Sequence, residues 1–255
     1  MDYERGRFCW VDLSAHDLDG AIAWYGKYFG WEAREEDTGG GPRYVTFFLD
    51  GQKVAGAGQM PDAQKEQMPP VWSSYIKVED CAADEAEAKE LGAETIVATM
   101  AVMDHGSLCL IRDPTGAAVG FWQAGSHGGA ERCNQPGSFT WNELATRDIE
   151  TAKHFYGELF GWRTKSIPGP NPTEIIHLGD RDNGHMLFMN EAWKGMPPMW
   201  TVYFAVGDCD VMAAKAEELG GKTMVPPFDI PAGRLSVVAD AQGAHFYIIA
   251  LKDPL

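Results

Sequence analysis

The hydrophobic and polar positions of the chain follow one pattern that recurs along its length. Residues 7–13 alternate in the way of a strand that is buried on one face, and a stretch with helical spacing then begins after Asp17 and ends at Gly30. Three more strand-like segments follow at residues 32–36, 44–49 and 54–59. The order strand, helix, strand, strand, strand predicts a β-α-β-β-β module over residues 7–60.

The same module is predicted three more times, at residues 70–124, 138–190 and 198–252. The first and third modules are closely alike, because the segment from Trp10 to Trp31 matches the segment from Trp141 to Trp162 without a gap. A repeat this long indicates two copies of one domain rather than a solenoid. The sequence therefore predicts an α+β protein with domains at residues 1–124 and 138–255, joined by a linker at 125–137.

Composition and charge narrow the possible partners. The 255 residues are 45% hydrophobic, which is enough for each domain to bury its own core. A formal net charge of -16 argues against nucleic acid and against an anionic membrane surface, because a phosphate polymer would be repelled. We find neither an apolar stretch of about 18 residues nor an N-terminal leader, and the cysteines form no C-x-x-C pair. We therefore expect a cytoplasmic protein without a disulfide framework.

Two motifs in the modules carry a family resemblance. The segment from Asp17 to Trp31 reads D-x-x-x-A-x-x-W-Y-x-x-Y-F-G-W, and the turn Asp113-Pro-Thr-Gly116 precedes the last strand of its module. With the tandem modules, these motifs resemble the vicinal oxygen chelate superfamily, which has the glyoxalase, bleomycin-resistance and extradiol dioxygenase fold, and in particular its two-domain bacterial glyoxalase-like branch. The resemblance implies half-barrel mixed sheets that enclose a small organic molecule, in a monomer or a homodimer. For Asp113 we predict a role in the turn alone.

The resemblance also gives the positions at which metal-dependent members hold their ion. In this chain those positions carry residues that are poor ligands for Zn, Ni, Fe or Mn. They are Trp10, Trp141, Ser74, Val202, Gly120 and Tyr247. We therefore expect no cofactor. The alternative is a divalent metal held by shifted ligands, for which the candidates are His177, His185, Glu143 and His245.

Asp12 and Glu143 are the main candidate catalytic residues. Period-two alternation places each of them on the same strand face as the Trp two residues earlier, and in the resembled family that face lines the cavity. A carboxylate beside an indole in a partly dry pocket can act as a general acid or base. The alternative is that both carboxylates only brace the half-barrel. His105 is a candidate proton shuttle, or simply an exposed loop histidine.

The candidate substrate-binding residues are mainly aromatic. A Trp stands near the start of each module, at positions Trp10, Trp72, Trp141 and Trp200. Such rings would stack on a flat apolar or aromatic ligand if they line the cavity, and they fill the core if they do not. Tyr247 would contact the same ligand. Arg234 would hold an anionic group of the ligand, or pair with Glu143 or Asp229.

Three functions are consistent with these assignments. The leading hypothesis is a metal-independent enzyme that encloses a small, mostly apolar or aromatic metabolite and catalyses an isomerisation, a cyclisation, or a lyase-type addition or elimination. The second is a binding protein of the bleomycin-resistance type, which sequesters such a compound without chemistry. The third is a metal-dependent lyase or dioxygenase with shifted ligands. Because the halves differ at Asp12/Glu143 and at His105/Arg234, we predict one working cavity and one degenerate cavity.

Overall fold

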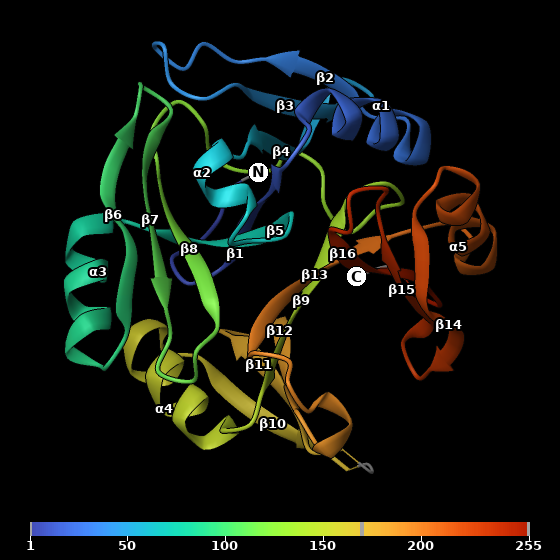
Figure 1. Cartoon of the computed structure of the whole chain (residues 1–255). Coiled ribbons are helices and arrows are strands. Elements are labelled where there is room, and N and C mark those ends of the chain that lie inside the picture. The colour runs from blue at the N-terminus through green and yellow to red at the C-terminus, as the bar shows by residue number, and fades with distance from the viewer. Residues whose placement is uncertain (1, 169–170, 254–255) are drawn as a thin grey trace. The chain divides into compact units, whose positions relative to one another are not determined.

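A computed structural model describes residues 2–168 and 171–253 (Figure 1). It contains the four predicted β-α-β-β-β modules, which we number 1 to 4 along the chain, and their strands form two mixed sheets of eight strands each. The predicted α+β class is therefore confirmed. Within the described ranges, no helix combines the length and the apolar character that a membrane crossing requires.

Modules 1 and 2 come from the first half of the sequence. Module 1 contains β1 (Phe8–Ala15), α1 (Leu18–Phe29), β2 (Glu32–Glu35), β3 (Tyr44–Leu49) and β4 (Gln52–Gln59), and the short helix α2 (Asp62–Lys65) follows it. Module 2 contains β5 (Val71–Val78), α3 (Cys81–Glu90), β6 (Glu94–Val102), β7 (Gly106–Arg112) and β8 (Ala118–Ala124). The strand order of their sheet is β2-β3-β4-β1-β5-β8-β7-β6, so that β2 and β6 are edge strands.

Modules 3 and 4 come from the second half. Module 3 contains β9 (Phe139–Thr146), α4 (Ile149–Phe160), β10 (Arg163–Ile167), β11 (Thr173–Leu178) and β12 (Arg181–Phe188), followed by the 3-10 turn η1 (Glu191–Trp193). Module 4 contains β13 (Met199–Ala205), α5 (Cys209–Glu218), β14 (Lys222–Ile230), β15 (Gly233–Ala239) and β16 (His245–Leu251). The strand order is β10-β11-β12-β9-β13-β16-β15-β14, which repeats that of the first sheet.

Local sequence explains where the helices begin and end. An aspartate side chain accepts hydrogen bonds from backbone N–H groups of the first turn in α1, α3, α4 and α5. These residues are Asp17, Asp80, Asp148 and Asp208. Gly30 and Gly161 end α1 and α4 in the left-handed conformation, with φ of 79° and 69°. The caps predicted for α1 from the sequence are therefore confirmed.

The chain divides into two compact units, each of which combines one module from each half of the sequence. The α3–α4 unit holds most of modules 2 and 3 and comprises the described residues within 1–10, 74–129 and 142–201. The α1–α5 unit holds most of modules 1 and 4 and comprises the described residues within 11–73, 130–141 and 202–255. In each unit the helix of one module packs against the helix of the other.

Each unit has an aromatic core that is closed by an equivalent hydrogen bond. In the α3–α4 unit, Trp162 donates its indole N–H to the carbonyl oxygen of Gly6 over 2.9 Å. In the α1–α5 unit, Trp31 donates to the carbonyl oxygen of Gly137 over 2.8 Å. Both glycines have a positive φ, of 88° and 83°, which other residues rarely adopt. The two copies of the module thus bury their Trp after the helix in the same way.

A chain of hydrogen bonds from indole to phenol to carboxylate, which we call the Trp–Tyr–Asp relay, crosses each core. In the α3–α4 unit, Trp200 donates to the hydroxyl of Tyr156 over 2.8 Å, and Tyr156 donates to Asp113 over 2.8 Å. The α1–α5 unit contains the same relay, at 3.0 Å for both bonds, in Trp72, Tyr25 and Asp240. Asp113 therefore does more than close a turn, contrary to the expectation from sequence.

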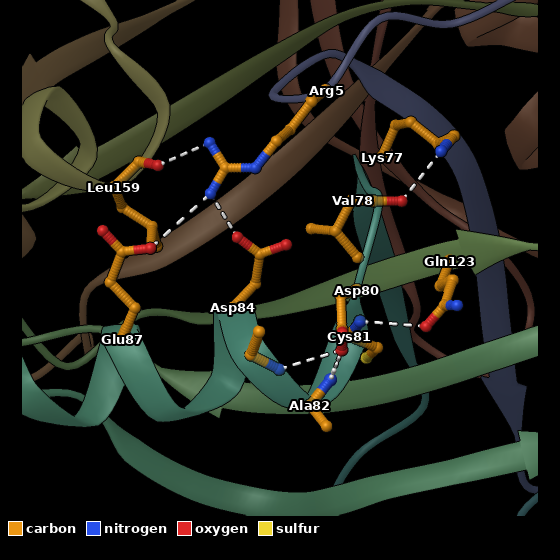
Figure 2. Close-up of polar contacts among 11 residues, drawn as sticks. Arg5, Lys77, Val78, Asp80, Cys81, Ala82, Asp84, Glu87, Gln123 and Leu159 are labelled. Atoms are coloured by element: carbon orange, nitrogen blue, oxygen red, sulfur yellow. Dashed lines mark hydrogen bonds and ion pairs between the residues drawn. The ribbon is translucent and has the colours of Figure 1, made fainter.

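The N-terminal segment is fastened to α3 and α4 by Arg5 (Figure 2). The guanidinium of Arg5 donates to the carbonyl oxygen of Leu159 over 2.9 Å and to the carboxylate of Asp84, and Glu87 lies 3.7 Å away. Asp84 is buried, so the guanidinium supplies the counter-charge that a buried carboxylate requires. We call this group of contacts the Arg5 clamp.

Candidate functional site

Strand register in each module aligns one residue from each strand into a row that faces one side of the sheet. From the edge strand inward, the rows are Arg34–Thr46–Gly56–Asp12, Val97–Leu110–Gly120–Tyr75, Lys165–Ile175–His185–Glu143 and Val225–Val237–Tyr247–Tyr203. Modules 1 and 3 therefore end their rows on a carboxylate, whereas modules 2 and 4 end theirs on a tyrosine.

The row of module 3 contains a carboxylate–imidazole pair. Glu143 on β9 and His185 on β12 are direct register partners, and His185 Nε2 lies 2.9 Å from Glu143 Oε2. Glu143 is only 3% exposed, so this contact supplies a polar partner inside the protein. The geometry suits proton transfer, because His185 can donate to the carboxylate and so orient it. The sequence grouped both residues with His177 and His245 as a candidate metal or acid/base cluster, but it did not show that Glu143 and His185 face each other.

The row of module 1 lacks this pairing. Asp12 on β1 occupies the place that Glu143 has on β9, but its register partner is Gly56, which has no side chain. Asp12 is half-buried. The two candidate carboxylates therefore differ in their immediate chemistry, since the row of module 1 offers no imidazole beside Asp12.

The row of module 4 forms an apolar and aromatic wall. Tyr203 and Tyr247 are register partners whose rings stack, with centroids 4.2 Å apart and an interplanar angle of 13°. They pack in one cluster with Leu235 and Ile249, and the half-buried Trp141 lies against the same cluster. We call the surface of Tyr203, Tyr247, Leu235 and Ile249, together with the exposed edge-strand residues Val225 and Phe228, the tyrosine wall.

The wall is more accessible at its edge than at its centre. Val225 is 40% exposed and Phe228 41%, whereas Tyr247 is 9% exposed. His245 lies on β16 two residues before Tyr247 and so shares its face. Burial lowers the pKa of His245, which keeps its imidazole neutral near pH 7. A neutral, flat or apolar molecule is therefore the ligand that this surface favours.

In module 2 the corresponding surface is filled by the protein's own side chains. A Cβ added at Gly120 would lie 2.3 Å from the ring of Tyr75, so the tyrosine occupies the space above the glycine. In the same compact unit, the ring of His127 from the linker lies 4.4 Å from that of Trp10 and 5.5 Å from that of Trp122. Trp122 also donates its indole N–H to the carbonyl oxygen of His127 over 2.8 Å.

Two of the predicted substrate-binding tryptophans lie in the cores. Trp72 and Trp200 are buried, and each donates its indole N–H to the tyrosine of a Trp–Tyr–Asp relay. The sequence left core and cavity wall as alternatives for these rings, and their positions match the core alternative. Trp141 instead packs against the tyrosine wall, and Trp10 against His127.

Arg234 and His105 lie outside the rows. Arg234 on β15 alternates with Leu235 and therefore points away from the tyrosine wall, toward α5. There it binds Asp210 over 2.8 Å and Asp229 over 3.2 Å, and the pairing with Asp229 is one of the predicted alternatives. His105 lies at the turn between β6 and β7, with its Nδ1 3.4 Å from the hydroxyl of Ser126.

Tyr203 was missed by sequence reasoning. The alignment to the family's metal positions selected Val202, one residue earlier, and its counterpart Ser74 in module 2. Register shows that Tyr203, not Val202, faces Tyr247. Ser74 instead donates a hydrogen bond to Asn142 over 2.6 Å. The repeated pattern W-x-x-Y, which starts at Trp72 and at Trp200, was the sequence signal that could have identified the tyrosines.

The alternative metal ligands do not assemble into a donor set in the part of the chain that the structure describes. There, no group of three or more His, Cys, Asp or Glu side chains is arranged to hold an ion. Glu143 and His185 are directed at each other, and His177 instead pairs with Asp182 over 2.7 Å. Metal sites in proteins usually take at least three protein donors. The residues present therefore do not fit the ion of the metal-dependent relatives.

Comparison with known proteins gives a consistent family. The protein-family model described as "Glyoxalase/Bleomycin resistance protein/Dioxygenase superfamily" matches residues 7–121 and 138–248 of this chain. The "Putative glyoxylase CFP32" of Mycobacterium bovis is 38% identical over 252 residues, covering 97% of this chain and 96% of the relative. The "Anthracycline biosynthesis protein DauV" of Streptomyces sp. is 31% identical over 263 residues, covering 98% and 95%.

Solved structures share the fold at low sequence identity. The Mn(II)-bound glyoxalase from Novosphingobium aromaticivorans superposes with a TM-score of 0.67 at 16% identity, covering 98% of this chain and 84% of that one. The 2,3-dioxygenase LapB from Pseudomonas sp. KL28 gives a TM-score of 0.65 at 13% identity, covering 100% and 98%. These likenesses concern the fold, because one fold hosts many chemistries. The predicted fold of two glyoxalase-like domains is confirmed.

Proposed function

The chain belongs to the Glyoxalase/Bleomycin resistance protein/Dioxygenase superfamily, and from this premise we propose that it is an enzyme that moves a proton on a small, mostly apolar or aromatic metabolite without a metal ion. The proposed ligand surface is the tyrosine wall of module 4. The proposed acid/base group is Glu143 with His185. The outcome would be an isomerisation, a cyclisation or a lyase-type reaction.

The observation that carries the proposal is the contact of 2.9 Å between Glu143 and His185. A buried carboxylate that is held by an imidazole can accept a proton from a bound molecule and return it at another position. The imidazole N–H keeps one carboxylate oxygen in place and so fixes the orientation of the carboxylate. An isomerisation of this kind is balanced, because the proton that leaves one atom of the substrate returns to another.

Strand β9 places an indole on the same strand face as the proposed carboxylate. Trp141 and Glu143 are two residues apart on β9, so their side chains share a face and lie about 7 Å apart along the strand. Trp141 packs against the cluster that contains Tyr203 and Tyr247.

The printed name of one relative supports an aromatic ligand. DauV is called an anthracycline biosynthesis protein, and anthracyclines contain fused, flat rings. The tyrosine wall crosses four strands, which corresponds to a width of about 14 Å at the usual spacing between strands. A fused-ring compound with few charges suits such a surface better than a small hydrophilic aldehyde does.

Metal independence is part of the proposal and rests on the donor chemistry. The two positions that end the row of module 4 carry stacked phenol rings, and the pair in module 3 supplies only two donors. Elemental analysis of the purified protein tests this part. One equivalent of a transition metal that survives dialysis, and whose removal abolishes activity, would contradict it.

Binding and proton transfer can be separated experimentally with an anthraquinone as probe. Quenching of the intrinsic fluorescence measures binding. The anthraquinone carries a ketone side chain, and mass spectrometry after incubation in D2O measures exchange of the C–H hydrogens beside that ketone. We expect Glu143→Gln to retain binding and lose protein-dependent exchange. Asp12→Asn is the matched control in module 1 and should change neither readout.

The competing function is a binder of the bleomycin-resistance type. The formal net charge of -16 favours cationic ligands and is the observation on its side. A binder would hold the anthraquinone or a cationic anthracycline tightly, and neither the natural chain nor Glu143→Gln would accelerate exchange above the rate in buffer. That result would contradict the proposed enzymatic activity and would show that the protein sequesters its ligand without chemistry.

A further inference from the structure

Two cysteines meet in the core of the α3–α4 unit. Cys81 is the first residue of α3, directly after the capping Asp80, and Cys109 is the central residue of β7. α3 packs on β7, both cysteines are fully buried, and both belong to the same core cluster. The two side chains therefore approach each other from the helix and from the sheet that it covers.

The polar surroundings make Cys81 the more acidic of the two thiols. A hydrogen bond from the Cys109 thiol lowers the pKa of Cys81, and the hydroxyl of Thr99 on β6 donates to the Cys81 sulfur over 3.6 Å. The first turn of a helix also favours negative charge. Conversely, the contact with Cys81 and burial raise the pKa of Cys109. Each thiol is thus the other's direct polar partner.

The α1–α5 unit provides an internal comparison. Cys209 is the first residue of α5 and corresponds to Cys81, but the position of Cys109 is held by Ser236 on β15. The sulfur of Cys209 lies 3.8 Å from the carbonyl oxygen of Ile248, and burial raises its pKa to about 11. Cys209 therefore shares the helix position of Cys81 without its thiol partner.

We propose that Cys81 and Cys109 form a reversible intramolecular disulfide when the protein meets hydrogen peroxide, so that α3 becomes covalently joined to β7. The Cys81 thiolate attacks one peroxide oxygen, the O–O bond breaks, and the departing hydroxide takes up a proton to leave as water. The sulfur of Cys109, on losing its proton, then attacks the resulting sulfenic acid, and the S–O bond breaks to release a second water. The two thiols lose two electrons in all and the peroxide gains them.

The place of Cys81 in α3 gives peroxide a route to the sulfur. Figure 2 shows Cys81 in the first turn of α3, where its backbone N–H donates to the side chain of Gln123 over 3.0 Å. Its neighbours Asp80 and Ala82 are exposed, so opening of a single helical turn uncovers the thiol. The bond would close a loop from residue 81 to residue 109 and restrict the unfolded chain.

Peptide mapping of the full chain tests the proposal. The native protein is treated with hydrogen peroxide, denatured in iodoacetamide and digested. We expect a cross-linked peptide that joins Cys81 to Cys109, a mass two hydrogens below the reduced form, and loss of the cross-link on treatment with dithiothreitol. Cys209 should remain fully alkylated and serves as the buried control at the same helix position.

Variants and a thermal readout complete the test. Cys81→Ser and Cys109→Ser should each abolish the cross-link, whereas Cys209→Ser should not change it. Oxidation should raise the Tm of the natural chain by several degrees and leave that of Cys109→Ser unchanged. Sulfinic acid at Cys81 with Cys109 still alkylated, a cross-link to Cys133, or no cross-link in the folded protein would each overturn the proposal.

Discussion

Tyr156 donates its phenol hydrogen to Asp113 over 2.8 Å, and the two residues come from different halves of the sequence. Asp113 closes a turn in module 2, whereas Tyr156 lies on α4 of module 3. The equivalent contact between Tyr25 and Asp240 joins module 1 to module 4. The relays therefore hold together modules that are distant in sequence, and they do so through buried polar groups whose loss is poorly tolerated.

Removal of the Tyr156 hydroxyl should destabilise the protein. Tyr156→Phe leaves the buried carboxylate of Asp113 without one donor and the indole N–H of Trp200 without its acceptor. We expect a loss of about 2 to 4 kcal/mol in the free energy of unfolding, measured by urea denaturation at pH 7. Asp113→Asn and the double variant complete the cycle, and strictly additive effects would contradict coupling between the two residues.

Burial of Asp113 and Asp240 gives stability a defined pH dependence. Burial raises the pKa of both carboxyls in the folded state, so the folded protein binds protons more tightly than the unfolded chain does. Above the folded pKa, the ionised carboxylate destabilises the folded state relative to the protonated form. This penalty disappears as the pH falls to the pKa of the carboxyl in the unfolded chain, which is near 4. Relative to Asp113→Asn, the natural chain should gain stability between pH 7 and pH 4.

The capping residue Asp148 should behave in the opposite sense. Hydrogen bonds from the backbone N–H and the hydroxyl of Thr151 lower the pKa of its carboxyl. Its contribution is therefore present above the unfolded pKa and is lost as the pH falls through the folded value. Urea denaturation of Asp148→Asn and Asp113→Asn over the same pH series shows whether the free energy of unfolding changes with pH in opposite directions at the two positions. Parallel curves for the two variants would refute this assignment.

The Arg5 clamp should contribute to stability although it lies near the end of the chain. Arg5→Met removes the counter-charge from buried Asp84 and a hydrogen bond from Leu159, and we expect a loss of about 1 to 3 kcal/mol. The matched control is Arg112→Met, whose partner Glu94 is exposed and 3.7 Å away, with an expected change of about 0 to 1 kcal/mol. Urea denaturation measures both, and equal losses would contradict the structural distinction.

Local sequence rules predicted the modules well because their signals are local. Asp17 and Gly30 mark the ends of α1 within a few residues, and alternation marks the strands. The pairing of modules is different, because Tyr156 and Asp113 have no signal that refers to each other. Only the folded chain shows that module 2 is joined to module 3 through them.

The sequence predicted several residues of the candidate site, but it did not predict which of them pair across neighbouring strands. Sequence alternation identified Glu143 but could not show that His185 lies opposite, since pairing of β9 with β12 depends on the topology of the sheet. A shift of one residue also selected Val202 in place of Tyr203, and such a shift exchanges the two faces of a strand. The alternatives for Trp72 and Trp200 required their hydrogen-bond partners to be seen.

The filled surface of module 2 leads to a prediction on stoichiometry. Tyr75 covers Gly120, and the His127 ring lies against Trp10 and Trp122, whereas in module 4 the edge of the tyrosine wall is exposed. Calorimetric titration with the anthraquinone should therefore give one equivalent per chain. Truncation of the wall by Tyr247→Ala should weaken binding about tenfold, which corresponds to about 1.4 kcal/mol of lost aromatic contact.

The comparison variant is Tyr75→Ala, which removes from module 2 the counterpart of Tyr203, the ring that covers Gly120, and should leave the affinity of the natural site unchanged. Because this truncation uncovers Gly120, it is also the change most suited to reveal a second, weaker binding event. Binding of two equal and independent equivalents by the natural chain would show that both halves bind alike. Equal losses of affinity in Tyr247→Ala and Tyr75→Ala would show that the ligand does not distinguish the tyrosine wall from the surface of module 2.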